Sequence, residues 1–286
     1  MTSGPAAGYG HRVPDQPTSP APPPAETPAH EAGSVSVVVL GAGSGSRGGA
    51  GGNKGLLPLA GRPVLAWSVL AALRTPGVAR VLVVAHPDEL DEVAEALAPH
   101  LPADSAGGTG STDGADDADG ADGGKGPGTP EVGLVAGGLT RHASESRALR
   151  ALAADVEAGR TEVVVVHDGA RPLAPVALFT AVVEAARARG GALPGAPMTG
   201  VLTRALQPVP SALVGVQTPQ AFRAGPLLAA YRRADDDGFE GTDTAACFAR
   251  YADLPVVAVA SGPANLKVTW PEDLALAEEL LGLSGR

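Results

Sequence analysis

A glycine-rich stretch follows the first apolar run of the chain and carries two positive charges. Residues 40–61, LGAGSGSRGGAGGNKGLLPLAG, contain nine glycines, and their charged residues are Arg47 and Lys54. Glycine lets backbone N–H groups approach a ligand closely, and phosphate is the usual ligand of such a loop. The stretch therefore predicts a phosphate-binding loop, although the same two residues could also be solvated charges on a loop without a ligand.

Two common kinds of phosphate-binding loop do not fit these residues. The spacing G-x-G-x-x-G occurs at 43–48, but a dinucleotide-binding loop also needs an acidic residue at the end of the second strand, about twenty residues on. Here the second apolar run ends well beyond that distance, in AHP at 85–87, without an acid at its tip. A Walker loop has Gly before its lysine and Ser or Thr after it, whereas Asn53 and Gly55 flank Lys54.

Transfer of a nucleotide suits the remaining pattern. When a substrate phosphate attacks the α-phosphate of a nucleoside triphosphate, pyrophosphate leaves and no side-chain nucleophile is needed. Catalysis then consists of alignment and of cations around the developing negative charge. Mg²⁺, or another divalent cation, would ordinarily bridge the triphosphate. Asp168 ends a valine-rich run, the position at which α/β proteins bind ligands, and is a further candidate functional residue.

Composition limits the partners that the chain could have. Its 286 residues are 44% hydrophobic, enough for a sizeable core in one or two domains. The formal charge of −10 argues against a nucleic-acid partner, and much of it lies in residues 1–33 and 101–130. The single cysteine, Cys247, excludes an internal disulfide and is expected to be a small buried residue. No apolar run reaches the roughly eighteen residues of a membrane span, so we expect a cytoplasmic protein without a membrane partner.

Apolar runs alternate with helical patterns along the chain. Nearly continuous apolar runs are typical of parallel strands that are covered on both faces. The alternation predicts an α/β fold, with a doubly wound, mostly parallel sheet flanked by helices and a ligand site at the carboxyl ends of the strands. The expected strands are 35–40, 80–85, 131–136, 162–167, 191–197 and 255–260, and the expected helices are 63–73, 88–98, 141–158, 174–188, 242–252 and 271–281.

Two segments interrupt this plan. Residues 1–33 are rich in Pro and Ala, have neither a basic start nor an apolar core, and are expected to be a disordered tail rather than a signal peptide. Residues 102–130 are rich in Gly, Asp and Ser and are expected to form a low-complexity acidic insertion. The remainder, 34–286, is expected to be one domain.

Three later segments make the chain resemble a known family. VHDGARPL at 166–173, TPQAF at 218–222 and NLKVTWPEDLALAEELL at 265–281 are similar to segments of the 2-C-methyl-D-erythritol 4-phosphate cytidylyltransferases and their ribitol-5-phosphate relatives. The resemblance runs from about residue 35 to 283. It implies a Rossmann-like nucleotidyltransferase fold with a short projecting arm at about 199–217, a homodimer, and transfer of CMP from CTP to a polyol phosphate in the non-mevalonate route to isoprenoid precursors.

The resemblance also implies roles for individual residues. Catalysis would depend on three cations around the triphosphate, namely Arg47, Lys54 and Lys267. The cytosine and ribose would lie against Gly41, Ala42, Gly43, Gly138 and Ser144. The acceptor would be bound by Asp168, Arg171 and Thr218, and Asp168 would either hold sugar hydroxyls or lie near the magnesium ion. Arg141 could either contact the nucleotide or cap its loop, and His167 is expected to be a packed strand-end residue because the reaction needs no base.

Departures from the family pattern gather on the acceptor side. The arm is short, and the positions where the family has a Thr and an Arg read Val201 and Pro210. Use of CTP is therefore better supported than the identity of the acceptor. Alternatives left open are a ribitol-5-phosphate-type or molybdopterin-type nucleotidyltransferase and a non-catalytic nucleotide-binding relative.

Overall fold

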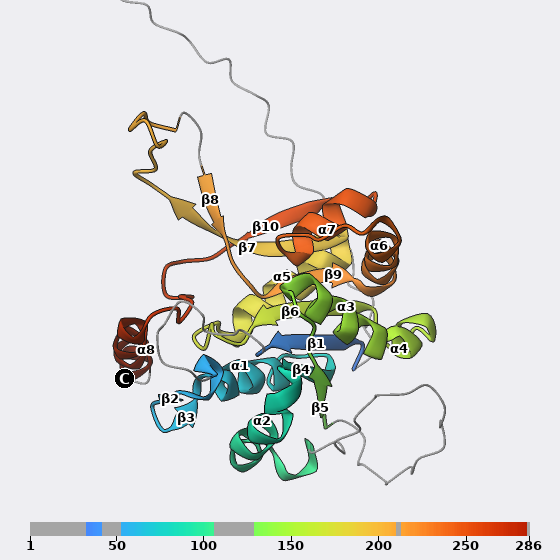
Figure 1. Ribbon diagram of the computed structural model, residues 1–286, viewed down its shortest axis with the longest axis horizontal. Coiled ribbons are helices and arrows are strands. Elements are labelled where there is room, and N and C mark those ends of the chain that lie inside the picture. Colours follow the sequence, from blue (N-terminus) through green and yellow to red (C-terminus); the bar gives the residue numbers. More distant parts are fainter. Residues whose placement is uncertain (1–32, 42–52, 106–128, 210–212, 285–286) are drawn as a thin grey trace, which may run out of the picture. The chain divides into compact units, whose positions relative to one another are not determined.

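The computed structural model describes residues 33–41, 53–105, 129–209 and 213–284. In these ranges eight strands form one sheet in the order β10-β7-β9-β6-β1-β4-β5, with β8 paired to β7 (Figure 1). The successive strands β6, β1, β4 and β5 are parallel to one another, and β10 is parallel to β7. Strand β9 is antiparallel to both β6 and β7, and β8 is antiparallel to β7. The predicted mostly parallel α/β sheet is confirmed.

The strands of the sheet are β1 (Val35–Leu40), β4 (Val78–Ala85), β5 (Glu131–Ala136), β6 (Val163–Asp168), β7 (Gly191–Met198), β8 (Leu213–Val216), β9 (Gln220–Arg223) and β10 (Val256–Ala260). Two short strands, β2 (Pro58–Leu59) and β3 (Arg62–Pro63), form a separate antiparallel ribbon.

Helices cover both faces of the sheet. Side chains of α1, α2 and α5 pack into the hydrophobic cluster on one face, and those of α3, α6 and α7 pack into the cluster on the other. Helix α8 packs against the β2–β3 ribbon and α1 in a third, smaller cluster. The α-helices are α1 (Val64–Leu73), α2 (Leu90–Leu97), α3 (Arg141–Ala151), α4 (Ala153–Glu157), α5 (Val176–Arg189), α6 (Ala224–Asp237), α7 (Thr244–Tyr251) and α8 (Pro271–Ser284).

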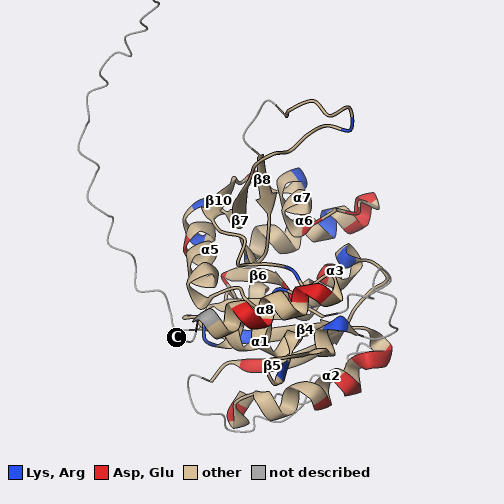
Figure 2. Ribbon diagram, turned by 90° about the vertical axis from the view of Figure 1, so that its left-hand side faces the viewer, with Lys and Arg blue, Asp and Glu red and all other residues tan. Residues whose placement is uncertain are grey.

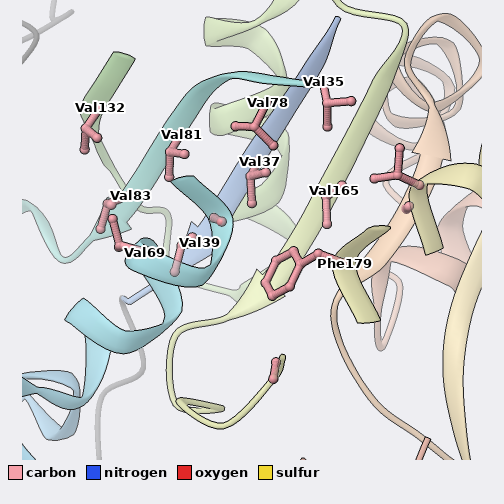
Figure 3. Close-up of a cluster of buried hydrophobic side chains, with 14 of the residues drawn as sticks. Val35, Val37, Val39, Val69, Val78, Val81, Val83, Val132, Val165 and Phe179 are labelled. Atoms are coloured by element: carbon pink, nitrogen blue, oxygen red, sulfur yellow. The ribbon is translucent and has the colours of Figure 1, made fainter. Parts of the chain in front are cut away.

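Valine alternation in β1 explains why helices are needed on both sides. Val37 and Val39 lie in the cluster with α1 and α5 (Figure 3), and Val38 lies in the cluster with α6 and α7. Successive side chains of a strand point to opposite faces, so an unbroken apolar run leaves both faces to be covered. All three valines are at most 1% exposed.

All six predicted strands are present, with bounds that differ by at most two residues. Strands β8 and β9 were not predicted, because four-residue antiparallel strands are too short for a periodic signal. Helix α6 was also missed. The predicted helix over 141–158 is divided at Leu152 into α3 and α4.

The start of α8 differs from its predicted capping box by one residue. A box formed by Thr269 and Glu272 with Pro271 in the first turn is expected from the sequence. In the structure the helix begins at Pro271, but Asp273 supplies the carboxylate: its Oδ2 accepts from the N–H groups of Thr269 and Trp270 at 2.7 and 2.8 Å. This cap holds the backbone that immediately follows Lys267.

A β-ribbon occupies the predicted arm. The last residues of β7 pair with β8, from Gly195 opposite Val216 to Met198 opposite Leu213. The described part of the connection has exposed apolar side chains, including Leu206, which is 74% exposed. Pro210 lies outside the described residues.

The tail and the acidic insertion lie almost entirely outside the described residues. At the beginning of the predicted insertion, however, Ala103–Ser105 form a 3₁₀ turn in which Ser105 is fully buried. The folded part of the chain therefore extends a few residues further than the composition predicts.

Candidate functional site

The carboxyl ends of β1, β4 and β6 meet at one edge of the sheet. Leu40 is the register partner of both Val84 and Asp168, so Gly41 follows directly at the edge where β6 ends. The Gly41 N–H donates to the Val84 carbonyl at 2.7 Å. A Cβ on Gly41 would lie 3.1 Å from the Leu65 side chain and 3.2 Å from that carbonyl, which is tight for any larger residue. The close packing accounts for a glycine where the backbone leaves the strand.

Asp168 is the centre of a cluster of positive charges at this edge. Its Oδ1 lies 2.5 Å from Arg141 Nη1, and its Oδ2 lies 2.9 Å from Lys267 Nζ and 3.8 Å from Arg171 Nε. Burial alone would raise the pKa of this carboxyl, but Arg141 and Lys267 hold it well below its ordinary value. Asp168 is therefore ionised at neutral pH and fixes cations that come from three separate segments.

The overall negative charge of the chain does not conflict with this cluster. Acidic side chains of the described residues are concentrated on helices such as α2, which carries Asp91, Glu92 and Glu95 (Figure 2). At the strand ends, by contrast, a carboxylate is surrounded by positive groups. An anionic substrate would meet a locally favourable field there.

Arg171 joins Asp168 to the segment before α8. Its Nη1 donates to the Asn265 carbonyl at 2.7 Å, and the Asn265 amide donates to the Thr218 carbonyl and to Gln217 Oε1, both at 3.0 Å. Burial lowers the pKa of Arg171, although Asp168 opposes the shift. The Arg171 side chain is only 13% exposed, and its guanidinium lies between Asp168 and the Asn265 carbonyl.

Lys54 lies against the same segment. Its Nζ donates to the Thr269 carbonyl at 2.5 Å and lies 6.0 Å from the centre of the Trp270 ring. Because Thr269 is two residues from Lys267, the structure brings the end of the glycine loop to the segment that carries the second predicted lysine. Arg47, the third predicted cation, lies outside the described residues.

Gly138 and Ser144, the predicted base-reading pair, are in direct contact. The Gly138 N–H donates to Ser144 Oγ at 3.0 Å, and this hydroxyl donates in turn to the Thr140 carbonyl at 2.9 Å. Thr140 caps α3 by accepting from the Ala143 N–H at 3.1 Å. A Cβ on Gly138 would lie 2.5 Å from the Ala143 Cβ, so the turn requires glycine. Ala42 and Gly43, the other predicted members of this pocket, lie outside the described residues.

Thr218 and His167 support Asp168 from inside the protein. Thr218 is buried, and its Oγ1 accepts from the Asp168 N–H at 2.9 Å and lies 3.2 Å from His167 Nδ1. His167 is fully buried, contacts the Phe179 ring, and has its Nε2 3.2 Å from the Arg171 carbonyl. Burial lowers the pKa of His167 to about 4, which leaves the imidazole neutral. His167 is thus a packed strand-end residue, as predicted.

Sequence reasoning left Arg141 ambiguous and missed Glu145. Arg141 contacts Asp168 through Nη1 and Glu145 through Nε, so it is part of the charged cluster. Glu145 is 1% exposed. One signal could have found it: Glu145 lies four and seven residues before the buried Leu149 and Leu152, on the apolar stripe of its helix.

Protein ligands for a metal ion are sparse in the described ranges. These residues contain no group of three or more His, Cys, Asp or Glu side chains placed to hold a metal. Both carboxylate oxygens of Asp168 already accept from cations. This donor set fits a magnesium ion bound mainly by substrate phosphates rather than one held in a protein cage.

The cations that Asp168 gathers at the strand ends, close to glycine backbone, can orient phosphates and neutralise negative charge that develops on them. The cluster offers no buried histidine base, since the His167 imidazole is occupied in packing. The fold and the charged cluster together suit a nucleotidyltransferase of the doubly wound α/β class. Within the described part of the chain, no helix combines the length and the apolar character needed to cross a bilayer.

Comparison with known proteins specifies the family. Residues 35–282 match the family model described as 2-C-methyl-D-erythritol 4-phosphate cytidylyltransferase, and the chain belongs to this family. A relative of that name from Cereibacter sphaeroides is 36% identical over 258 residues, covering 87% of this chain and 98% of its own.

Solved structures agree with this assignment. The enzyme of the same name from Thermus thermophilus is 30% identical with a TM-score of 0.59, and the alignment covers 86% of this chain and 98% of the other. The 4-diphosphocytidyl-2C-methyl-D-erythritol synthase structure from Anaerococcus prevotii, 23% identical, has a TM-score of 0.65 over 87% of this chain and 96% of the other, and it supports the fold. The chain is accordingly a cytidylyltransferase, and the molybdopterin-type alternative gains no support.

Proposed function

We propose that the site around Asp168 transfers CMP from CTP to 2-C-methyl-D-erythritol 4-phosphate, which gives the CDP-alcohol and pyrophosphate in isoprenoid precursor biosynthesis. The observation that carries this proposal is the convergence of Arg141 and Lys267 on Asp168, at the strand edge where Gly41 leaves β1. CTP, the donor, is available in the cytoplasm, where we expect the protein to act.

The chemistry needs positive charge from several sides. An oxygen of the acceptor phosphate attacks the α-phosphorus of CTP and forms the new P–O bond, while the bond from that phosphorus to the β-phosphate bridging oxygen breaks and pyrophosphate departs. Lys54 and Lys267, together with Arg47 of the glycine loop, would neutralise the charge on the transferring and leaving phosphates. The contact between Lys54 and Thr269 supports a common position for the two lysines.

Recognition of CTP would use both sides of this edge. The bonded pair Gly138 and Ser144 presents backbone and hydroxyl groups that suit a pyrimidine amino group and ring nitrogen. Gly41, with Ala42 and Gly43, would lie along the nucleotide. We expect the pocket between these two segments to be too small for a purine.

Mg²⁺ or another divalent cation would neutralise the triphosphate and activate its α-phosphate. The phosphates would provide most of its ligands, with Asp168 as the nearest protein carboxylate.

The acceptor side would be completed by a second copy of the chain. Arg171 would face the acceptor phosphate of its own subunit, whereas Thr218, whose buried hydroxyl accepts from the Asp168 N–H, would support that side from within the protein. The exposed apolar side chains of the β7–β8 ribbon, such as Met198, Leu206 and Val214, are suited to contact another subunit. A homodimer formed through this ribbon is therefore expected, in which Val201 and Pro210 replace the polar residues typical of the family.

Pyrophosphate release tests the assignment. The full chain is assayed with CTP, ATP or GTP and with 2-C-methyl-D-erythritol 4-phosphate, ribitol 5-phosphate or no acceptor. We expect release only with CTP and a polyol phosphate, fastest with the methylerythritol phosphate, and loss of release in excess EDTA. Equal rates with purine triphosphates would contradict the cytidylyl assignment, and faster turnover of ribitol 5-phosphate would change the acceptor.

A further inference from the structure

A buried carboxylate lies behind the charged cluster, where α3, α6 and α7 meet. Glu145 of α3 accepts from Arg141 Nε at 2.8 Å and from Thr244 Oγ1 at 3.0 Å through Oε1, and its Oε2 accepts from the Tyr231 hydroxyl. These donors belong to three different helices. Glu145 is 1% exposed, so it contributes to the site without contact with solvent or substrate.

The environment of Glu145 is built to keep it bonded. Burial raises the pKa of Glu145, while Arg141, Tyr231 and Thr244 all stabilise its ionised form. The pKa of Tyr231 lies well above 10 because of burial and the nearby carboxylate, so the phenol remains a donor. The Tyr231 ring stacks on His142, with 4.7 Å between centroids and an interplanar angle of 12°. A buried carboxylate is tolerated only with such complete bonding.

Arg141 connects this buried carboxylate to the site. Its planar guanidinium is bonded through Nε to Glu145 and through Nη1 to Asp168, on two sides of one rigid group. Contact at two separate nitrogens fixes the orientation of the plane as well as its position. Arg141 is 30% exposed, whereas the carboxylates on either side are nearly inaccessible. Of these three groups, Arg141 is the one that a substrate can reach.

We propose that Glu145 is a positioning residue for cytidylyl transfer, which acts by holding Arg141 against Asp168 at the carboxyl end of β6. Loss of the Glu145 charge would leave Arg141 attached at one side only, and the Asp168 carboxylate would lose the fixed orientation of one of its partners. Lys267, which is bonded to the other oxygen of Asp168, would be affected in turn. The inference rests on the proposed role of the Asp168 site in CMP transfer.

A double-mutant cycle separates this role from a purely structural one. Glu145→Gln keeps the shape and one acceptor, whereas Arg141→Met removes the guanidinium through which Glu145 is proposed to act. Turnover and KM for both substrates are measured for the two single variants and the double variant of the full chain. We expect each single change to lower kcat roughly tenfold or more, and Glu145→Gln to cause little further loss in the Arg141→Met background, because contacting residues of one network are not additive.

Two further variants test whether a loss of kcat comes only from a general disturbance of α3 or from poor folding of Glu145→Gln. Ser146→Ala removes a hydrogen bond from the same helix α3 to Asp235 of α6 without touching Arg141, so its kcat should equal that of the wild type. Tyr231→Phe removes one donor to Glu145 and should lower kcat several-fold with a milder effect on melting temperature, which keeps the test usable if Glu145→Gln folds poorly. The loss from Tyr231→Phe should also disappear in the Arg141→Met background.

Specific outcomes would overturn the inference. One is a kcat equal to that of the wild type for Glu145→Gln or for Arg141→Met. The other is a loss of kcat from Glu145→Gln or Tyr231→Phe that is as large in the Arg141→Met background as in the wild type. A wild-type chain inactive with CTP and every acceptor would instead contradict the proposed function, and a fully active Asp168→Asn variant would contradict the site. The double-mutant cycle is interpreted only if the wild-type chain is active and Asp168→Asn abolishes that activity. Failure of the proposed function or of the site can therefore be told apart from failure of the role of Glu145.

Discussion

Lys267 and Asp168 are separated by 99 residues, yet the Lys267 ammonium lies 2.9 Å from the Asp168 carboxylate. The segment before α8 therefore lies against the carboxyl end of β6. Thr269, in the same segment, accepts from Lys54 of the glycine loop. The folded chain thus places Lys54 and Lys267, two cations that nucleotidyl transfer would use, at one segment of the site.

Asp168 should make the stability of the protein decrease more steeply as the pH falls into the acid range. Its folded-state pKa lies below the ordinary value of about 3.9, so its ion pairs stabilise the fold above that pH and the contribution is lost as the pH falls through the folded-state pKa. We expect the melting temperature of Asp168→Asn to fall less than that of the wild type between about pH 5 and pH 3. Calorimetry over this range measures both slopes, and equal slopes would contradict the ion-pair account.

His167 should affect stability in a different pH window. Its pKa is about 4 in the folded chain and about 6.5 when unfolded, so below pH 6.5 the unfolded state binds the proton first. Stability is therefore lost as the pH falls from about 6.5 to about 4, by a total of order 3 kcal/mol.

Replacement of His167 by Gln should flatten this decrease, as measured by urea unfolding at several pH values. His86→Gln is the control, because the His86 side chain is half exposed. If the two variants and the wild type show parallel pH dependence, His167 does not titrate as described.

The sequence was sufficient for the framework of the site. Unbroken valine runs predicted the central strands, and the position of Asp168 at the end of such a run predicted a functional carboxylate. Resemblance to the family also directed attention to Lys267 and Ser144. These features depend on local pattern or on short motifs, which a single sequence displays.

Other parts depend on packing that no local pattern encodes. The contacts of Glu145 come from Arg141 on its own helix and from Tyr231 and Thr244, which are 86 and 99 residues away. Thr218 was predicted to face the acceptor, and in the structure its hydroxyl accepts from the Asp168 backbone. Which side of a residue is available to a substrate is decided by such distant neighbours.

Gly138 offers a direct test of the base-reading turn. An added methyl group would lie 2.5 Å from the Ala143 Cβ, so Gly138→Ala must displace the first turn of α3 and with it Ser144. We expect KM for CTP to rise roughly tenfold or more, with a smaller change in KM for the acceptor, because a hydrogen-bonded pocket is displaced. Gly225→Ala is the matched control, since a Cβ there meets no atom within 4 Å. A KM for CTP unchanged in Gly138→Ala would remove this turn from the nucleotide site.

The β7–β8 ribbon should determine the oligomeric state. Leu206 and Val214 are 74% and 52% exposed, and a charge at either position would have to be desolvated in an interface. We expect Leu206→Glu together with Val214→Glu to convert a dimer to a monomer in light scattering, with the melting temperature nearly unchanged. Leu276→Glu, on α8, is the control for an exposed apolar residue outside the ribbon. A double variant that remains dimeric would place the interface elsewhere.

The lysine cluster makes the sharpest prediction about catalysis. Lys54 contacts the segment that carries Lys267, although the two lysines are far apart in the sequence. The departing pyrophosphate needs charge from more than one side. Alanine at either position should lower kcat by roughly 10²–10³, the usual loss for one transition-state donor, with little change in melting temperature. Arg47→Ala should behave alike.

The chain contains one further lysine, Lys125, in the acidic insertion, and Lys125→Ala is therefore the matched control. Lys54→Arg should not restore activity, because a planar guanidinium cannot replace a compact ammonium that donates to the Thr269 carbonyl at 2.5 Å. Steady-state pyrophosphate release measures all of these rates. If folded Lys267→Ala turns over as fast as Lys125→Ala, then Lys267 only neutralises Asp168 and does not stabilise the transferring phosphate.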